Sequence, residues 1–357
     1  NISRPHLCHY FENVRAVVCS STLSFSSIMF WFFVWLFFCF VFLWRVFEQF
    51  YRNKRVPNLS IRYVFITGCD TGFGNLVARS LDAKGVPVFA GCLTEESAKA
   101  LRDGCSSRLK TVQLDVTDKE SVQNALSTVK ENLPENQGLW GLVNNAGIMP
   151  NFCPTEFLTV GDFEKVSNVN LFGTISVTLA FLPLIRKERG RIVNVSSVVG
   201  LCGIPGCTDY SVSKAAVRMF SSCLRRELYR SGVKVHTIEP GGFATQITNM
   251  NRLQDAFLKS YKQTDDEVKS YYSVIIQKVY NNFKPSRHHT FFMNGNPRMV
   301  SDAMEHAVLA AHPKSSYLVG NDARYVFRFL HLLPEWIVDL SMAWPDPKGK
   351  ESLPRIF

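Results

Sequence analysis

The chain has 357 residues, of which 46% are apolar, so it is long enough to bury a sizeable core in one or two domains. Its formal net charge is +10, but the basic residues are scattered rather than clustered, which argues against a nucleic-acid-binding surface. The 10 cysteines form no CxxC pair and no Cys/His spacing typical of zinc sites. We therefore expect no metal and a reducing compartment, in which Cys202 and Cys207 stay unpaired.

An uncharged and strongly aromatic segment stands near the start of the chain. Residues 28–44 read IMFWFFVWLFFCFVFLW, and a helix of this length is roughly 25 Å long, near the lower limit for crossing a bilayer. A cleaved signal peptide is the alternative, but a small-residue cleavage site should then follow, and Arg45 and Phe47 follow instead. We predict a transmembrane anchor over 28–47, followed by a linker over 48–60. The place of residues 1–27 in the mature protein stays open.

The basic residues around this segment predict its orientation. Four of them follow it between positions 45 and 55, whereas Arg4 and Arg15 precede it. The positive-inside rule then places the main domain in the cytosol. A modestly basic surface also suits an anionic membrane face. We expect a single-pass protein of the endoplasmic reticulum membrane.

From residue 61 onward, short apolar runs alternate with segments of helical periodicity. The apolar runs predict strands at 63–67, 86–92, 109–116, 141–147, 191–197 and 233–242. Helices are predicted at 75–85, 94–104 and 119–133. Strands that alternate with helices of this length form a parallel, doubly wound, Rossmann-type sheet. We predict a single catalytic domain of this α/β class over 61–320.

A glycine-rich loop, TGCDTGFG at 67–74, joins the first strand to the first helix. Gly68 would permit a tight turn, Gly72 would let the backbone approach a pyrophosphate, and Gly74 would let the helix pack on the sheet. The N–H groups at the start of the helix would face the phosphates. Such glycines can also mark a plain turn, but their place between a strand and a helix indicates a dinucleotide site.

The stretch TDYSVSK places Tyr210 four residues before Lys214, on one helical face. In isolation such a pair is most often surface decoration. Here it follows a dinucleotide loop, and Ser197 lies thirteen residues upstream. A nearby ammonium would lower the pKa of Tyr210, which is about 10 for a free tyrosine. Tyr210 is therefore a candidate general acid/base for an alcohol hydroxyl.

The order and spacing of these motifs resemble the short-chain dehydrogenase/reductase family over roughly residues 60–345. TGCDTGFG is similar to the family's cofactor loop, LDV to its adenine contact and NNAG at 144–147 to its sheet-stabilising turn. VNLFG, NVSS, YSVSK and PGGFAT follow in the family's order. Within the family, ITGCDTGFGN, GLWGLVNNAG and SKAAVRMFSS resemble the branch of retinol dehydrogenases and 17β-hydroxysteroid dehydrogenases, with the type 2 17β-enzyme nearest in appearance.

The resemblance implies a role for each matching residue. Tyr210 would be the acid/base, Lys214 its partner, Ser197 the holder of the substrate oxygen, and Asn170 the holder of a water that links the lysine to solvent. Ser196 is the alternative to Ser197, and the family's spacing selects Ser197. The implied cofactor contacts are Thr67, Gly68, Asp70, Gly72, Phe73, Gly74, Asp115, Asn144, Ala146, Gly147, Tyr210, Lys214, Pro240, Gly241 and Thr245. The implied substrate contacts are Ser197, Tyr210 and Phe243. Asn144 and Asn145 could instead be structural, because their amides can bridge strands.

The cofactor and the reaction follow from the same motifs. The loop contains Asp70 but no Arg or Lys that could bind the 2′-phosphate of NADP, so NAD is favoured over NADP. An acidic residue at the usual ribose-binding position is missing, however, because Glu95 and Glu96 come slightly after it in the sequence. We expect oxidation of a lipophilic alcohol, a 17β-hydroxysteroid to its ketone, with retinol to retinal as the alternative. A cofactor-binding but catalytically silent scaffold is a further alternative, and the intact catalytic set argues against it. The resemblance also implies a homodimer.

Two further segments lie beyond the family's motifs. Residues 245–300 are helical and aromatic and predict a substrate lid, in which Tyr271, Tyr272 and Phe283 either line an apolar pocket or belong to the core. The tail, 321–357, contains an apolar stretch interrupted by charges that would be costly inside a bilayer, and Pro334 would kink it. We expect this tail to rest on the membrane or to pack on the core.

Overall fold

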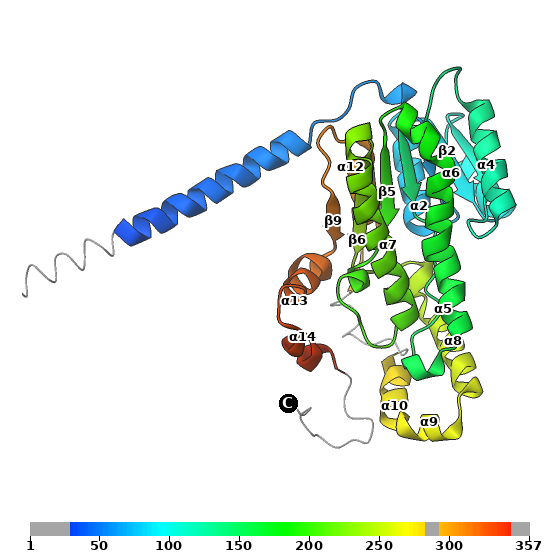
Figure 1. Ribbon diagram of the computed structural model, residues 1–357, viewed down its shortest axis with the longest axis vertical. Helices are drawn as coiled ribbons and strands as arrows, with labels where there is room; N and C mark the ends of the chain where they lie inside the picture. The colour runs from blue at the N-terminus through cyan, green and yellow to red at the C-terminus, as the bar shows by residue number, and fades with distance from the viewer. Residues whose placement is uncertain (1–28, 283–292, 344–357) are drawn as a thin grey trace, which may run out of the picture. The chain divides into compact units, whose positions relative to one another are not determined.

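The computed structural model describes residues 29–282 and 293–343, drawn in colour in Figure 1. The chain divides into two compact units, of which the first ends at Arg55. In the part of it that is described, the helix Met29–Arg52 has 24 residues, about 36 Å, and its large apolar side chains are exposed all round. A helix that is apolar on every side is typical of a membrane span. It contains most of the predicted anchor, 28–47, and continues beyond it.

The second unit, from Val56 onward, is built on a seven-stranded parallel sheet. Its order is β3-β2-β1-β4-β5-β6-β9. The strands are β1 (Val64–Ile66), β2 (Val88–Cys92), β3 (Leu109–Gln113), β4 (Gly141–Asn144), β5 (Arg191–Val195), β6 (Lys234–Pro240) and β9 (Ser316–Val319). β1 pairs with both β2 and β4, so the order reverses there, and ligands bind such sheets at the carboxyl ends of these strands. The predicted Rossmann-type fold is confirmed.

Two differences from the sequence prediction concern the edge of the sheet and the glycine-rich loop. β9 was not expected, because it has four residues and begins at an exposed serine, so its apolar pattern is short. The first helix of the domain, α2 (Gly72–Ala83), begins at Gly72 rather than at residue 75. The glycines of the loop form its first turn, and a helical pattern of apolar residues cannot reveal a turn made of glycine.

Helices cover both faces of the sheet (Figure 1). One core layer packs α2, α3 (Glu95–Asp103) and α12 (Arg298–Leu309) against the strands. The other packs α4 (Lys119–Asn132), α6 (Thr174–Lys187) and α7 (Thr208–Glu227). In this second layer Phe65 of β1 stacks on Phe181 of α6 with ring centres 4.4 Å apart. Because both faces are covered, the central strands are continuous apolar runs rather than alternating ones.

One long helix, Val160–Lys187, contains a wide turn. It consists of α5 (Val160–Ser167), the π-helical turn η3 (Asn168–Gly173) and α6. Thr159 caps its start in a capping box with Asp162. It is long and apolar enough for a membrane span, but its buried side chains belong to the domain core. π-helical turns occur often at functional sites, and η3 carries Asn170.

The segment between β6 and α12 and the tail after β9 follow the carboxyl ends of their strands. β7 (Gly242–Phe243) pairs with β8 (Met293–Asn294), and between them lie η6 (Gln246–Thr248), α8 (Met250–Gln263), α9 (Asp266–Tyr271) and α10 (Ser273–Asn282). The tail forms η7 (Asp322–Phe327), α13 (Arg328–Leu330) and, after Pro334, α14 (Glu335–Met342). Short 3-10 turns are η1 (Leu59–Ile61), η2 (Thr155–Phe157), η4 (Val198–Gly200) and η5 (Tyr229–Ser231). Figure 1 places α13 and α14 at the same end of the domain as α8 to α10.

Candidate active site

The glycine-rich loop has a backbone conformation that strongly favours glycine. Gly68 and Gly72 have φ angles of +68° and +64°, in the left-handed region. At Gly74, a Cβ would stand 2.3 Å from the carbonyl oxygen of Gly68 and 2.5 Å from Nδ2 of Asn145. The loop therefore closes tightly on the start of α2, and the N–H groups of this first turn are left facing the carboxyl end of the sheet.

Side chains from β1 and β4 hold this loop in place. Asn145 donates through Nδ2 to the carbonyl oxygens of Thr67 (3.0 Å) and Gly68 (2.9 Å). The Thr67 hydroxyl accepts from the N–H groups of Asn145 and Ala146, each at 3.0 Å. Asn144 is buried and donates to Thr178 and Asn194, each at 2.8 Å. The side chains of Thr67 and Asn144, predicted as cofactor contacts, are thus engaged in joining strands and helices.

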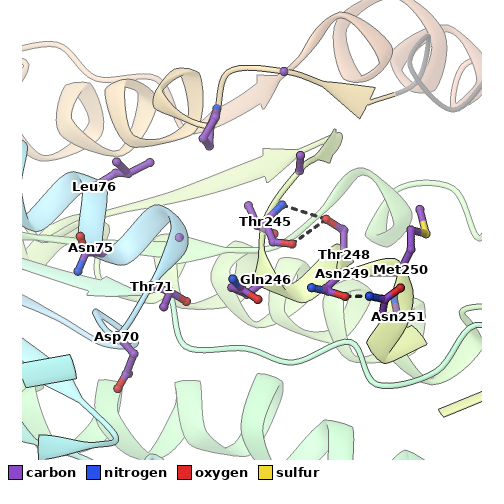
Figure 2. Close-up of a pocket in the computed structure, with 14 residues that line it drawn as sticks. Asp70, Thr71, Asn75, Leu76, Thr245, Gln246, Thr248, Asn249, Met250 and Asn251 are labelled. Carbon is purple, nitrogen blue, oxygen red and sulfur yellow. Dashed lines mark hydrogen bonds between the residues drawn. The ribbon is translucent and has the colours of Figure 1, made fainter. Parts of the chain in front are cut away.

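A cleft of about 1050 Å³ opens beside the loop (Figure 2). One wall is the loop and the start of α2, from Asp70 to Leu76, and the other is the segment 244–251 with the predicted contact Thr245. A second cleft, of about 510 Å³, lies at the ends of β2 and β3 and contains Asp115. The Asp115 carboxylate accepts from the N–H and the hydroxyl of Thr117, at 2.8 and 2.7 Å. The two clefts have the size range of small-molecule sites.

Asp70 connects the glycine loop to the end of β2. Its carboxylate accepts from the N–H groups of Leu93 (3.0 Å) and Thr94 (3.1 Å) and from the Ser97 hydroxyl. These donors form the end of β2 and the start of α3. A negative charge therefore already occupies the N-terminal end of α3, where helix N–H groups favour anions. The sequence placed Asp70 in the loop, but this contact across to β2 could not be predicted from it.

The side chains of Lys214 and Asn170 both lie beside Gly147. A Cβ at Gly147 would stand 3.3 Å from Nζ of Lys214 and 3.2 Å from Oδ1 of Asn170. Lys214 is buried, and its Nζ donates to the carbonyl oxygen of Val195 at 2.9 Å. Asn170 accepts from the N–H of Ile148 at 2.8 Å and donates to its carbonyl oxygen at 3.0 Å. The predicted pair is thus brought together from η3 and α7 at the exit of β4.

Tyr210 stands beside Ser197. The Ser197 hydroxyl is hydrogen-bonded to the Tyr210 phenol and lies 3.4 Å from the carbonyl oxygen of Pro240. Lys214 Nζ is 5.7 Å from the centre of the Tyr210 ring. Ser196 instead donates to the backbone carbonyl of Lys214 at 2.7 Å. The structure therefore gives Ser196 a packing role and places Ser197 next to the tyrosine.

Burial shifts the pKa values of both Lys214 and Tyr210. It lowers the pKa of Lys214 to about 8. It also raises the pKa of Tyr210 above its ordinary value, and the hydrogen bond with Ser197 opposes this only in part. The expectation that Lys214 would bring the Tyr210 pKa below that of a free tyrosine is therefore wrong, because desolvation of the phenolate is the larger effect.

The aromatic residues expected around the substrate are mostly packed. Phe243 is 2% exposed and meets Phe73 edge to face, with ring centres 5.8 Å apart, so it belongs to the core and does not line an open pocket. Tyr272 packs on Phe157 at 5.8 Å, whereas Tyr271 is half exposed. Phe283 lies outside the described residues. The aromatic residues of the sequence do not identify the substrate pocket, because the residues that pack against them come from distant parts of the chain.

Asp322 is a site residue that the sequence did not reveal. Its carboxylate accepts from the N–H of Gly242 at 2.7 Å. A Cβ at Gly241 would stand 2.1 Å from both carboxylate oxygens, so a side chain there would displace the Asp322 carboxylate from this contact. The N–H of Gly241 donates to Val319 at 2.8 Å. Asp322 thus fixes the turn that runs from β6 to Thr245 and the large cleft.

These features fit a nicotinamide dinucleotide. Gly72 leaves open space where a side chain would stand, and the helix behind it presents N–H groups. Gly147 keeps a side chain away from the catalytic pair, since its Cβ would stand 3.2 Å from Asn170 Oδ1 and 3.3 Å from Lys214 Nζ. Among the described residues, no group of three or more His, Cys, Asp or Glu is placed to hold a metal ion. Cys202 and Cys207 are free thiols.

Comparisons with known proteins agree with this site. The family model for short chain dehydrogenases matches residues 62–256. Retinol dehydrogenase 7 of Rattus norvegicus is 45% identical over 87% of this chain and 97% of its own length, and human 17-beta-hydroxysteroid dehydrogenase type 6 is 43% identical over 88% and 99%. A short chain dehydrogenase from Burkholderia cenocepacia, solved with NADP, shares the fold with a TM-score of 0.60 at 23% identity, covering 80% of this chain and 98% of that one. The chain therefore belongs to the short-chain dehydrogenase family, in the branch of retinol and 17β-hydroxysteroid dehydrogenases, and is an oxidoreductase that acts on alcohols with a nicotinamide cofactor.

Proposed function

We propose that this protein is a membrane-anchored dehydrogenase that uses NAD to oxidise a lipophilic alcohol, a 17β-hydroxysteroid to its ketone. The observation that carries the chemistry is the convergence of Tyr210, Ser197, Lys214 and Asn170 at the carboxyl ends of β4 and β5. The human relative named 17-beta-hydroxysteroid dehydrogenase type 6 supports the steroid. A second candidate, oxidation of retinol to retinal, is supported by the relatives named retinol dehydrogenase 7 and 16.

Each residue of the set has a defined part in the proposed reaction. Tyr210 Oη takes the proton of the substrate hydroxyl, and Ser197 Oγ, hydrogen-bonded to that phenol, holds the substrate oxygen beside it. The Lys214 ammonium stabilises the phenolate relative to a neutral residue at the same place, because opposite charges attract at this range. Asn170 holds the turn at Ile148 against α7, and we propose that it also orders a water leading from Lys214 to solvent. When bound, the nicotinamide supplies the hydride acceptor.

Replacing Tyr210 by Phe tests the proposal. Membranes that carry the full chain would be incubated with NAD and, one at a time, estradiol, testosterone, androstanediol, all-trans-retinol or 11-cis-retinol. We expect kcat to fall by at least a thousand-fold for the accepted substrate, whereas NADH binding, followed by its fluorescence, should persist. Tyr229→Phe, at an exposed residue of η5, is the matched control and should turn over normally. Unchanged turnover in Tyr210→Phe would instead support a cofactor-binding scaffold.

The preference for NAD rests on Asp70. The 2′-phosphate of NADP would approach the end of β2, where the N–H groups of Leu93 and Thr94 already bind the Asp70 carboxylate. Arg102, the basic residue on α3 that faces this region, pairs with Glu95 and the Thr111 hydroxyl. A second anion at this position would be repelled by Asp70, and we infer that the site discriminates against NADP for this reason.

The Asp70→Asn variant removes the negative charge while keeping a side chain of nearly the same shape, so it tests whether the charge sets the cofactor preference. Removal of the charge should improve kcat/KM with NADP relative to NAD by at least ten-fold, a factor that corresponds to about 1.4 kcal/mol. Asp103→Asn, at the exposed far end of α3, is the control and should leave the ratio unchanged. A wild-type preference for NADP, or no change in the ratio in Asp70→Asn, would contradict the assignment.

We further propose that the helix Met29–Arg52 crosses the endoplasmic reticulum membrane once and leaves the domain in the cytosol. The excess of basic residues after the helix supports this orientation. Protease added to intact microsomes should then digest the domain, and the Asn58→Gln variant should migrate like the wild type because the sequon at Asn58 is never glycosylated. Full protection, or a mobility shift abolished by Asn58→Gln, would place the domain in the lumen.

We also propose a homodimer. Phe172 and Leu179 on the long helix and Val212 and Met219 on α7 are each more than half exposed, and η3 and α7 are in contact. Two apolar helical faces of this kind suit a second copy of the chain. Leu179→Glu with Met219→Glu should halve the sedimenting mass in detergent, whereas Tyr229→Glu should not. A monomeric wild type would exclude this interface.

A further inference from the structure

The tail of the domain carries apolar side chains that the domain itself leaves uncovered. Tyr325, Phe329, Leu332, Trp336 and Leu340 are between 47% and 75% exposed. They recur every three or four residues, so those within η7 and α13 share one helical face, as do those within α14. We name these five residues the C-terminal apolar face. Single exposed apolar residues are ordinary on protein surfaces, but a series of them marks a contact surface.

The opposite side of the same segment is built into the active site. Phe327 packs in one cluster with Val198, the residue that follows Ser197. At the start of the segment, Asp322 holds the N–H of Gly242 at 2.7 Å. The segment leaves β9, the edge strand, so no further strand of the sheet covers it. The C-terminal apolar face is therefore attached to two of the segments that position the catalytic and cofactor-binding residues.

The chain also keeps a bilayer close to this domain. Arg52 ends the exposed apolar helix, and four residues later the N–H of Val56 donates to the carbonyl oxygen of Leu309 at 2.8 Å. An extended chain advances at most about 3.5 Å per residue, so the domain begins within about 14 Å of the end of that helix. A tether this short gives lipid a high effective concentration at the domain surface.

We propose that the C-terminal apolar face rests in the interfacial layer of a lipid bilayer and turns the substrate site toward it. Tyrosine and tryptophan, both present on the face, are the side chains enriched at that depth. The segment has no excess of basic residues, because Arg324 and Arg328 stand against Asp322, Glu335 and Asp339. Apolar burial, rather than attraction to anionic headgroups, should therefore drive the contact, and zwitterionic phosphatidylcholine should suffice. The idea rests on the proposed function only in assuming that the substrate dissolves in lipid.

Lipid contact can be measured without any turnover. The full chain would be reconstituted in phosphatidylcholine vesicles that contain a photoactivatable phosphatidylcholine, and labelled peptides would be mapped by mass spectrometry. We expect adducts on residues 324–343 as well as on 29–52, unchanged in 1 M salt, and none around Val160 or Tyr229, which are exposed apolar residues elsewhere. Adducts confined to 29–52 would overturn the proposal, and so would chemical cross-links between two copies through this face.

A pair of substitutions tests the link to the substrate. Leu332→Ser with Trp336→Ser changes two exposed side chains, so the fold should persist, and it should reduce labelling of 324–343 by at least five-fold. The KM for a vesicle-borne alcohol should rise at least five-fold, with kcat and the KM for NAD unchanged. Val160→Ser with Tyr229→Ser is the matched control and should alter neither readout. Reduced labelling with an unchanged KM would overturn the proposal that the substrate site faces the lipid. If the chain oxidises no alcohol, the proposed function is wrong. The photolabelling result would still show whether the C-terminal apolar face contacts lipid.

Discussion

Replacing Lys214 by Met should make the protein more stable while it abolishes activity. Lys214 is 3% exposed, and its burial lowers the pKa from 10.5 to about 8. At about 1.4 kcal/mol per pKa unit, the buried charge costs about 3 kcal/mol of folding free energy at neutral pH. Methionine fills a similar volume without charge, but leaves the carbonyl oxygen of Val195 without its donor, which costs about 1 kcal/mol. The net gain should be about 2 kcal/mol.

The pH dependence identifies the cause of this gain. Between the folded-state pKa of about 8 and the ordinary value of 10.5, the unfolded chain holds a proton on Lys214 that the folded chain has released. Stability of the wild type therefore rises with pH through this window, and below it the charged lysine carries its full cost. The advantage of Lys214→Met should be complete at pH 7 and should vanish near pH 10.

Thermal unfolding in detergent, without cofactor, measures both values. A gain of about 2 kcal/mol should raise the midpoint by about 3 to 4 °C at pH 7 for a domain of this size. Lys99→Met, at an exposed position of α3, is the control and should shift the midpoint at neither pH. A midpoint that falls at pH 7, or a gain that persists at pH 10, would refute the idea that the catalytic ammonium is held at a cost in stability.

Three further outcomes are expected. Gly74→Ala should raise the KM for NAD at least ten-fold, because its Cβ would stand 2.3 Å from the carbonyl oxygen of Gly68, whereas Gly203→Ala, whose Cβ meets nothing within 4 Å, should leave steady-state kinetics unchanged. Phe181→Ala should lower the free energy of unfolding by about 3 to 5 kcal/mol, measured by denaturant titration, because it empties a buried and stacked ring position. Asp322→Ala should reduce kcat/KM about ten-fold by removing the carboxylate that accepts from the N–H of Gly242, and Asp322→Asn, which keeps an acceptor, should restore most of it.

The parts of this protein that the sequence predicts are those with a local cause. Each central strand is a short run of buried apolar residues, and each helix after it repeats at the helical period, so both can be recognised without knowing what packs on them. The glycine loop is equally local, because the φ angles of Gly68 and Gly72 favour glycine over residues with a side chain. The pairing of Tyr210 with Lys214 follows from one helical turn.

What the sequence did not predict depends on contacts between distant segments. Asp70 reaches the end of β2 and Asp322 reaches Gly242, and neither contact leaves a pattern in the chain. Phe243 was expected at the substrate, but Phe73 from the glycine loop packs against it. The raised pKa of Tyr210 has the same origin, since burial is set by the whole fold, whereas the neighbouring lysine is visible in the motif.

Because of the wide turn η3, the exact number of residues in the long helix Val160–Lys187 matters for function. Each residue of an α-helix advances the next by about 100° around the axis. Val166 before the turn and Phe181 after it both point into the core, while Asn170 within it reaches Ile148 beside the catalytic lysine. Removing or adding a single residue between 160 and 187 would keep the helix continuous but rotate one end against the other. Either Val166 or Phe181 would then turn out of the core, or Asn170 would turn away from Ile148. We therefore expect active relatives to carry this helix without insertions or deletions.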